Sequence, residues 1–379
     1  MHLNLTQVSA YFKRYTKIGA IVIGGYYLWI LVIVPASVGT FKAIFNRPAP
    51  PNPVYGLLDP LEFVEKSTLN STPTFALNTK NGRLPSGFPV TMPVYKFKAK
   101  PFSYLSSDNA LKDAAYLGFS ESDLITDLKG TVFRWRNPIT GTVLEIDKDS
   151  RRINQNTNLT GKSQDFVPGT ITEADAKKKA IQLFKDLTRF NDTLYPLGFQ
   201  NVVLGSYSGS KMTQTTATRD AEIARVDLYR KVGDYNILGP DPKKGLLNAF
   251  IRGNAAQNSQ DVLNYPKIDA NYTEIDTKSV ATYSIIPISQ AWKAVSAGQG
   301  IVVNVTPAGT NPFEEIPATA IGNVLIDNMY LAYYESIKPE NFLQPIYVFE
   351  GKYTTSANAG GSIVIYFPAV AGENVKKIE

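Results

Sequence analysis

The chain has 379 residues, of which 44% are hydrophobic and 19% are charged, and it contains no cysteine. Disulfides, thiolate catalysis and zinc–thiolate sites are therefore excluded. The single histidine, His2, lies near the N-terminus, which excludes a Ser-His-Asp triad, a histidine metal site and a histidine general base from the rest of the chain.

The net charge of +6 is concentrated at the N-terminal end. Residues 1–47 hold five of the 39 Lys and Arg residues and no acid, which leaves 34 basic residues against 33 acidic ones in residues 48–379. Proteins that bind nucleic acid carry a basic surface, and the large C-terminal part is close to neutral. The composition therefore predicts no nucleic-acid partner.

The first predicted element is a membrane-spanning helix. The uncharged run from Ile18 to Phe41 contains 24 residues, and about 20 apolar residues are enough to cross a bilayer. A cleaved signal peptide would have an apolar stretch of roughly 7–15 residues followed by a small-x-small site. Because the run is longer and Ala36-Ser37-Val38 is a poor match to such a site, we favour an anchor, and cleavage of the segment stays open.

The charges that flank this run predict its orientation. Lys13, Arg14 and Lys17 precede it, whereas Lys42 and Arg47 follow it. Positive residues are enriched on the cytoplasmic side of a span. We therefore expect a single-pass protein of the cell membrane, with residues 1–17 as a cytoplasmic tail and the ectodomain outside the cytoplasm.

Residues 42–93 are predicted to be a stalk and linker. Residues 46–60 carry five prolines, which favours an extended, semi-rigid segment that lifts the ectodomain from the membrane. Residues 67–93 are rich in Thr, Asn, Pro and Gly and are expected to be irregular.

The first predicted module covers residues 94–165. Residues 94–99 alternate like a strand, and residues 106–118 have the spacing of a helix that ends at a glycine. Two alternating runs, 131–136 and 142–147, flank a turn that contains Pro and Gly, which predicts a β-hairpin.

The second module, residues 166–265, begins with the clearest helix of the sequence. Thr172 and Asp175 form a start that resembles a capping box. Strands are expected at 201–207, 222–232 and 245–252. The residues that share the apolar face of the helix are Ala176, Ala180, Leu183, Phe184 and Leu187.

The third module, residues 266–379, begins with a short helix. Ser289 is predicted to cap this helix and Trp292 to point inward. Strong strand patterns follow at 321–334, 344–353 and 362–367. The three modules together predict an α+β fold, in which an N-terminal transmembrane helix is followed by tandem units of a helix packed on an antiparallel sheet.

Four segments resemble a known family of bacterial regulators. ITEADAKKKAIQLFKDL at 171–187 resembles the helix of PepSY-like domains. PISQAWKAVSAGQG at 287–300, NMYLAYYES at 328–336 and LQPIYVFEGKY at 343–353 look like the C-terminal repeat of YycH/YycI-type extracytoplasmic regulators. The resemblance covers residues 94–367 and implies a single-span membrane protein with tandem helix-plus-sheet modules. In that family the role is to modulate a membrane sensor kinase, and no catalytic residue is carried over.

Charged residues offer two candidate sites. Glu145, Asp147 and Asp149 share one strand face, and a solvated edge is favoured there over a metal or acid–base site. The Gly-Pro-Asp-Pro loop at 239–245 lacks the spacing of a phosphate-binding loop, and its prolines remove amides that would hold phosphate. Its two lysines, Lys243 and Lys244, are candidates for contact with a partner.

Aromatic residues are concentrated in the last long strands. Alternation places about half of them in a core, which is the favoured interpretation of the group. Tyr333 and Tyr347 are the candidates for the outward half, where tyrosine is favoured at interfaces.

The sequence thus predicts an interaction or regulatory protein of the cell envelope rather than an enzyme. It offers no catalytic, cofactor-binding or metal-binding residue and no evident small-molecule substrate, so an envelope or membrane protein is the expected partner. Two alternatives stay open: a carboxylate-dependent enzyme that processes cell wall or carbohydrate, and a scaffold subunit of a surface or secretion apparatus. An enzyme of that kind needs two acids roughly 5–10 Å apart across a cleft.

Overall fold

The computed structural model describes residues 50–66, 73–98, 106–126, 130–190, 193–316, 319–355 and 359–377, with Tyr26, Trp29 and Ala357 as single residues. The chain divides into two compact units, Met1–Pro50 and Pro51–Glu379. The predicted cytoplasmic tail and all but two residues of the predicted span lie outside the described residues. Within the described residues, no helix combines the length and the apolar character needed to cross a membrane.

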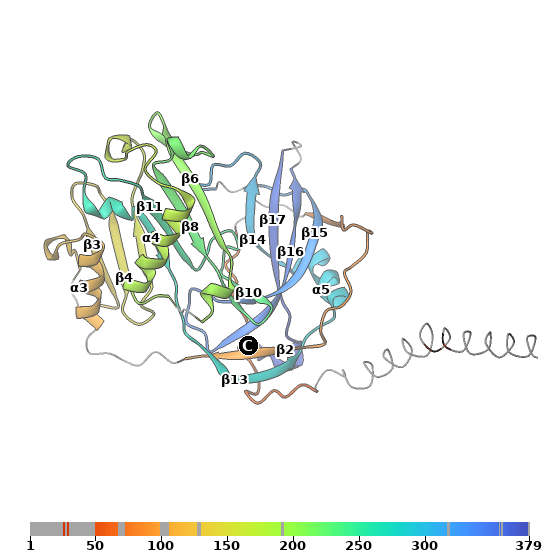
Figure 1. Cartoon of the computed structure of the whole chain (residues 1–379). Helices are drawn as coiled ribbons and strands as arrows, with labels where there is room; N and C mark the ends of the chain where they lie inside the picture. The colour runs from red at the N-terminus through yellow and green to blue at the C-terminus, as the bar shows by residue number, and fades with distance from the viewer. Residues whose placement is uncertain are drawn as a thin grey trace, which may run out of the picture. The chain divides into compact units, whose positions relative to one another are not determined.

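The unit Pro51–Glu379 mixes α and β structure, with mostly strands and few helices, as the sequence predicts (Figure 1). Its strands form two sheets, one of eight strands and one of nine.

In the eight-stranded sheet every strand is antiparallel to its neighbours. The predicted hairpin is confirmed as β3 and β4, whose turn is closed by Asn137, since its Oδ1 accepts from the amides of Ile139 and Thr140. The strands, in sheet order, are β3 (Val132–Arg136), β4 (Val143–Asp147), β5 (Ile153–Asn156), β12 (Lys267–Ala270), β11 (Leu247–Arg252), β8 (Ile223–Leu228), β6 (Gln200–Ser208) and β7 (Lys211–Gln214).

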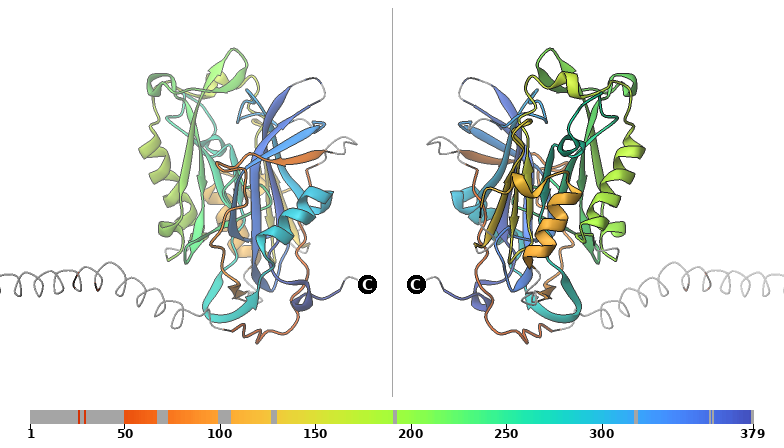
Figure 2. Two further views of the ribbon diagram at one scale, coloured as in Figure 1. Left: turned by 90° about the vertical axis from the view of Figure 1, so that its right-hand side faces the viewer. Right: turned by 90° about the vertical axis from the view of Figure 1, so that its left-hand side faces the viewer.

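Two helices, α3 (Ser106–Tyr116) and α4 (Glu173–Asp186), pack on one face of this sheet. Thr172 is the N-cap of α4, and its Oγ1 accepts from the amide of Asp175 at 3.1 Å. All the residues predicted for the apolar face of α4 are buried. The side view in Figure 2 shows these helices on the outer side of the sheet.

The nine-stranded sheet is built around two long antiparallel strands, β15 (Asn323–Tyr334) and β16 (Phe342–Thr354). Shorter strands complete each edge, and two of them, β1 and β10, run parallel to β15, although the sequence predicted only antiparallel pairing. The shorter strands are β1 (Thr74–Leu77), β2 (Thr91–Phe97), β9 (Arg230–Val232), β10 (Tyr235–Leu238), β13 (Ile275–Ser284), β14 (Ile301–Pro307) and β17 (Gly360–Pro368).

The third helix, α5 (Ile288–Ala294), packs on the nine-stranded sheet. Trp292 is partly buried there, and its ring lies 6.2 Å from that of Phe349 on β16. The prediction that Ser289 caps this helix is wrong: the N-cap is Pro287, and it makes no side-chain cap hydrogen bond. Because Pro287 fixes φ near −60°, the helix starts directly after it.

Most strands of the first two predicted modules share the eight-stranded sheet, whereas β2, β9 and β10 belong to the nine-stranded one. Conversely, β12 of the third predicted module lies in the eight-stranded sheet. The chain passes from β8 to β9, and so from one sheet to the other, through the single residue Tyr229. The boundaries 94–165, 166–265 and 266–379 stay predictions.

Residues 51–66 do not form the free stalk that their prolines predicted. Asn52 bridges to Thr282, and Leu58 bridges to Val375 and is fully buried. The ring of Phe63 packs 4.8 Å from that of Tyr334. Large apolar residues among and after the prolines, such as Leu58 and Phe63, explain the difference, because the folded unit offers them a surface on which to be buried.

Candidate functional site

Two of the four residues that the sequence offered for partner binding are buried. Tyr333 has 0% and Tyr347 has 1% of its surface exposed, so neither side chain is available to a partner. Their hydroxyl groups donate to backbone carbonyls, Tyr333 to Pro93 at 2.8 Å and Tyr347 to Ile286 at 2.7 Å. Both tyrosines therefore belong to the core.

The prediction that about half of the aromatic side chains on β15 and β16 face outward is wrong, because both faces of these strands are covered. Tyr333 and Phe349 pack in a cluster on one face, which α5 helps to cover. Tyr334 and Val348, the immediate neighbours of these two residues along their strands, pack in a cluster on the opposite face. Alternation predicts a solvated side only when one face of a sheet is open.

Lys243 and Lys244 are exposed, as the sequence predicts. They lie in the connection from β10 to β11, residues 239–245, which we call the basic turn. Neither lysine forms an ion pair with a residue in the described part of the chain. The main chain around them, in contrast, is held tightly.

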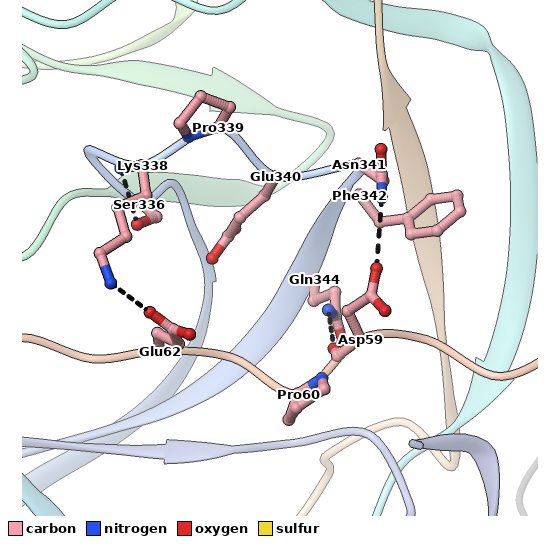
Figure 3. A pocket seen from close by; sticks show the side chains of 10 residues that line it. All are labelled: Asp59, Pro60, Glu62, Ser336, Lys338, Pro339, Glu340, Asn341, Phe342 and Gln344. Carbon is pink, nitrogen blue, oxygen red and sulfur yellow. Dashed lines mark hydrogen bonds and ion pairs between the residues drawn. The ribbon is translucent and has the colours of Figure 1, made fainter. Parts of the chain in front are cut away.

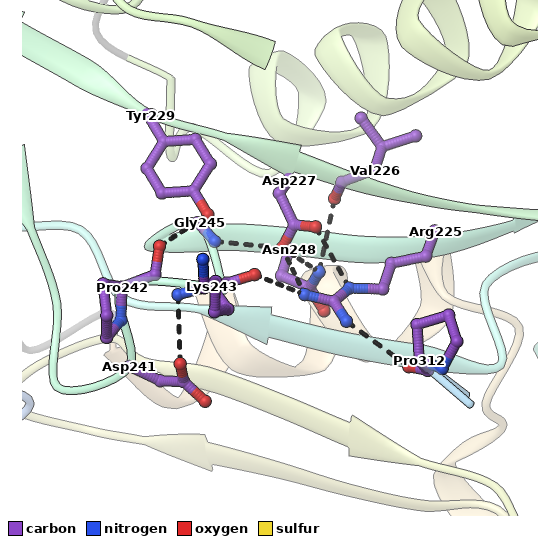
Figure 4. A network of polar contacts seen from close by, with 10 residues as sticks. All are labelled: Arg225, Val226, Asp227, Tyr229, Asp241, Pro242, Lys243, Gly245, Asn248 and Pro312. Atoms are coloured by element: carbon purple, nitrogen blue, oxygen red, sulfur yellow. Dashed lines mark hydrogen bonds and ion pairs between the residues drawn. The ribbon is translucent and has the colours of Figure 1, made fainter. Parts of the chain in front are cut away.

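A buried polar network fixes the basic turn (Figure 4). Arg225 donates to the carbonyl of Lys243 at 2.7 Å and to Asp227 at 3.2 Å. Asp227 accepts from the amide of Gly245 at 2.9 Å and from Asn248 at 2.6 Å. Asp227 has 0% of its surface exposed, and an unpaired carboxylate there would be costly, so the arginine and amide donors stabilise its charge.

The nine-stranded sheet also holds the basic turn. Asn304 on β14 donates to Asp241 at 2.9 Å, and the hydroxyl of Tyr366 on β17 donates to the carbonyl of Gly239 at 3.1 Å. Asp241 further accepts from the amide of Lys243 at 3.0 Å, which closes a local turn. The turn is thus fixed from both sheets.

Lys267 on β12 lies close to the basic turn. Burial lowers its pKa, and the positive charge of Lys244 lowers it further, while Glu315 acts in the opposite direction. Its Nζ lies 5.6 Å from the centre of the Phe250 ring, a cation–π contact. Lys267 therefore lies within electrostatic range of Lys244.

A second candidate region is an acidic pocket of about 230 Å³ between residues 59–62 and the β15–β16 connection. Figure 3 shows the Glu340 side chain pointing into it, with Glu62 and Asp59 on either side. Asp59 pairs with Lys376 at 2.6 Å, and Glu62 pairs with Lys338 at 2.6 Å.

Glu340 is the unusual group of this acidic pocket. Its Oε2 is buried and has no hydrogen-bond partner among the described residues. Burial raises the pKa of Glu340 to about 8, and the negative charges of Glu335, Glu62 and Asp59 contribute to the rise. Hydrogen bonds from Lys376 and Asn341, in contrast, lower the pKa of Asp59. At neutral pH the pocket therefore holds a protonated Glu340 near the ionised carboxylate of Asp59.

Behind the acidic pocket lies a fully buried ion pair between Arg230 on β9 and Glu335 at the end of β15. The guanidinium also lies 5.5 Å from the Tyr272 ring and 5.9 Å from the Tyr195 ring. Burial disfavours the charge of Arg230, but pairing with Glu335 outweighs it and raises the pKa. The pair joins β9 to the centre of the nine-stranded sheet.

A larger cavity, of about 570 Å³, opens beside the acidic pocket and shares Glu340 with it. Its polar lining mixes Lys96 and Lys98 with Asp149 and Asp276. Charges of both signs give no clear preference for one kind of ligand.

Of the three acids predicted to share one strand face, Glu145 and Asp147 on β4 have structural partners, whereas Asp149 lies beyond the strand and lines the larger cavity. Glu145 pairs with Arg134 at 2.7 Å. Asp147 accepts from the amides of Asp149 and Ser150, which closes the turn to β5. In the part of the chain that the structure describes, no group of three or more acids or histidines is arranged to hold a metal ion.

No family model matches the chain, and no curated protein does. Among solved structures, the chain is similar to an uncharacterized protein from Eubacterium rectale, with 9% sequence identity and a TM-score of 0.41. The similarity covers 77% of this chain and 86% of that chain. A likeness at this level assigns no function.

Proposed function

We propose that this chain is a membrane-anchored, extracytoplasmic interaction protein that binds another envelope or membrane protein and regulates it. The observation that carries the proposal is the packing of residues 51–66, which follow the predicted span after only a few residues. They pack against the rest of the unit Pro51–Glu379. Leu58 is buried in the core. Asp59 forms an ion pair with Lys376, and Glu62 forms one with Lys338.

This packing gives a physical route between the ectodomain and the span. A partner that displaces or tightens residues 51–66 changes the strain on the segment that leads into the membrane. A free stalk of similar length would absorb that change, because flexible linkers transmit little force or orientation. Regulation of a membrane partner through span and ectodomain contacts is also the role that the YycH/YycI resemblance implies.

The order of elements agrees with tandem helix-plus-sheet modules. Each of the helices α3, α4 and α5 precedes antiparallel strands, namely β3 to β5, β6 to β8 and β14 with β17. Tandem modules that follow a single span are the architecture we propose, with the span at residues 18–41.

The proposal is tested by photo-crosslinking of the full chain in its native membrane. A photoreactive residue replaces exposed residues such as Lys244, Leu197 or Ile139, and mass spectrometry identifies what each captures. We expect one envelope or membrane protein to be captured from a subset of these positions. The control joins residues 1–50 to an unrelated exported domain. Capture of the same proteins by both chains would contradict the proposal.

A carboxylate-dependent enzyme is the second candidate, and Glu340 is the observation that favours it. A protonated acid beside ionised carboxylates is a typical arrangement for acid–base catalysis. Against it, Asp59 and Glu62 are both engaged by lysines. Release of soluble fragments from purified cell wall by the full chain, abolished by Glu340→Gln, would establish this candidate.

A further inference from the structure

We propose that the basic turn, together with Lys267, is a docking site for an acidic segment of the partner protein. The inference rests on the proposed function and adds the chemistry of the contact. Three observations support it: the turn is rigid, its charge is not compensated, and its surroundings limit the size of the occupant.

The rigidity follows from the hydrogen bonds to the turn. Its backbone carbonyls and amides are bound by Arg225, Asp227 and Tyr229 from one sheet and Tyr366 from the other. Of these four, the aspartate and the tyrosines have 3% or less of their surface exposed. A loop held this way loses little conformational entropy when a partner binds, so a larger share of the interaction energy appears as affinity.

The two exposed lysines of the turn lack ion pairs among the described residues, whereas Lys267 has the negative charge of Glu315 near it. The nearest carboxylate of the turn, Asp241, is bound by Asn304 and by the amide of Lys243. Burial is the main cause of the lowered pKa of Lys267, and repulsion from the charge of Lys244 lowers it further. Carboxylates of a partner would relieve this repulsion and gain charge-assisted hydrogen bonds.

The surroundings favour a short protein segment over an anionic membrane surface. Glu314 and Glu315 are exposed beside Lys211 and Lys267, so a broad negative surface would meet repulsion there. Each lysine near an anionic bilayer contributes only about 1 kcal/mol, and three lysines would not hold the ectodomain on it. A segment with two or three carboxylates can contact the lysines and avoid the flanking acids.

The test uses the full chain in phosphatidylcholine nanodiscs and a fluorescent peptide of alternating Glu and Ser. Fluorescence anisotropy measures binding of this peptide and of a control peptide with Gln in place of Glu. We expect only the Glu peptide to bind, and Lys243→Glu with Lys244→Glu to weaken binding by roughly tenfold or more. The matched control is Lys177→Glu with Lys178→Glu on α4, which changes the net charge equally and should leave binding intact.

Several results would overturn the inference: no binding of the Glu peptide, equal binding of the Gln peptide, or equal loss with both lysine pairs. Added phosphatidylglycerol vesicles should not displace the peptide; displacement that requires Lys243 and Lys244 would assign the site to a lipid. If peptide binding fails while native-membrane crosslinks persist, this inference is wrong and the proposed function stands. If the crosslinks fail, the proposed function is wrong whatever the peptide does.

Discussion

At the scale of single residues, Glu340 is notable because its surroundings disfavour the ionised form of its carboxyl group. Its carboxyl is buried without a hydrogen-bond partner and is surrounded by Glu335, Glu62 and Asp59. Burial raises its pKa from 4.5 to about 8. In the unfolded chain the same group ionises near pH 4.5, so stability is lost progressively as the pH rises from 4.5 to 8.

We therefore predict that Glu340→Gln stabilises the protein at pH 8 and not at pH 4. The gain should increase through the intervening range and reach roughly 4–5 kcal/mol, because the pKa differs by about 3.5 units and each unit corresponds to about 1.4 kcal/mol. Urea unfolding of both proteins at several pH values measures it. An equal difference between the two proteins at every pH would contradict the raised pKa.

Trp292 provides a second residue-scale prediction. It packs on Phe349 while staying partly exposed, so Trp292→Ala should cost less than the 3–5 kcal/mol typical of a fully buried tryptophan. We expect a loss of roughly 2 kcal/mol and a lower melting temperature. Ile139→Ala, at a residue with 71% of its surface exposed, serves as the control and should change stability little. An unchanged melting temperature for Trp292→Ala with loss of partner capture would instead make Trp292 a binding residue.

At the scale of elements, residues 51–66 show how packing on the folded unit distinguishes two neighbouring residues of the same type. Leu58 has 0% and its neighbour Leu57 has 54% of its surface exposed, although the two residues are identical in chemistry. We predict that Leu58→Ala lowers the free energy of unfolding by about 2–4 kcal/mol, whereas Leu57→Ala changes it by less than about 0.5 kcal/mol.

Thermal melts and limited proteolysis of the full chain distinguish the two leucine variants. With Leu58→Ala, cleavage within residues 51–66 should become faster, because the segment is held less firmly. Equal melting temperatures and equal rates of cleavage for the two variants would show that these residues form a free stalk. The proposed link between the ectodomain and the span through residues 51–66 would then be wrong.

The predictions for individual elements succeeded where the local pattern was strong. Helix α4 follows from its cap at Thr172 and its apolar face, and the hairpin of β3 and β4 follows from alternation around a Pro and Gly turn. Strands β5 (INQN) and β7 (KMTQ) were not predicted, because their sequences are short and mostly polar. Only their hydrogen-bonded neighbours in the sheet fix them as strands.

The run 222–232 shows how tertiary contacts override a local pattern. It was predicted as one strand, but the chain changes sheets at Tyr229, so that β8 and β9 end up in different sheets. The buried pair of Arg230 and Glu335 holds the second half against the end of β15. Nothing in the alternation of these residues indicates such a change.

At the scale of the whole molecule, the predicted membrane topology can be tested directly. The flanking charges predict that the ectodomain lies outside the cytoplasm. A fluorescent protein that matures only in the cytoplasm, fused after Glu379, should therefore stay dark. A fusion to residues 1–17 alone, which should fluoresce, controls for expression. Bright fluorescence of the full fusion would reverse the topology and remove the envelope partner from consideration.

The sequence by itself determined the features that depend on composition or on neighbours along the chain. The missing cysteines and the isolated histidine exclude whole classes of chemistry. Periodicity located the three helices and the two long strands β15 and β16, and the position of two lysines between a proline and a glycine marked an exposed loop. Each of these follows from the local chain, where spacing decides which residues share a face.

Only the tertiary structure decided which surfaces are free. Tyr333 and Tyr347 looked like interface residues until both faces of β15 and β16 proved to be covered, and residues 51–66 looked like a stalk until Leu58 proved to be buried. The network around Asp227 and the acidic pocket around Glu340 join residues that lie far apart in the sequence. Burial and like-charge proximity depend on packing between distant segments, and packing of that kind leaves no periodic signal in a single sequence.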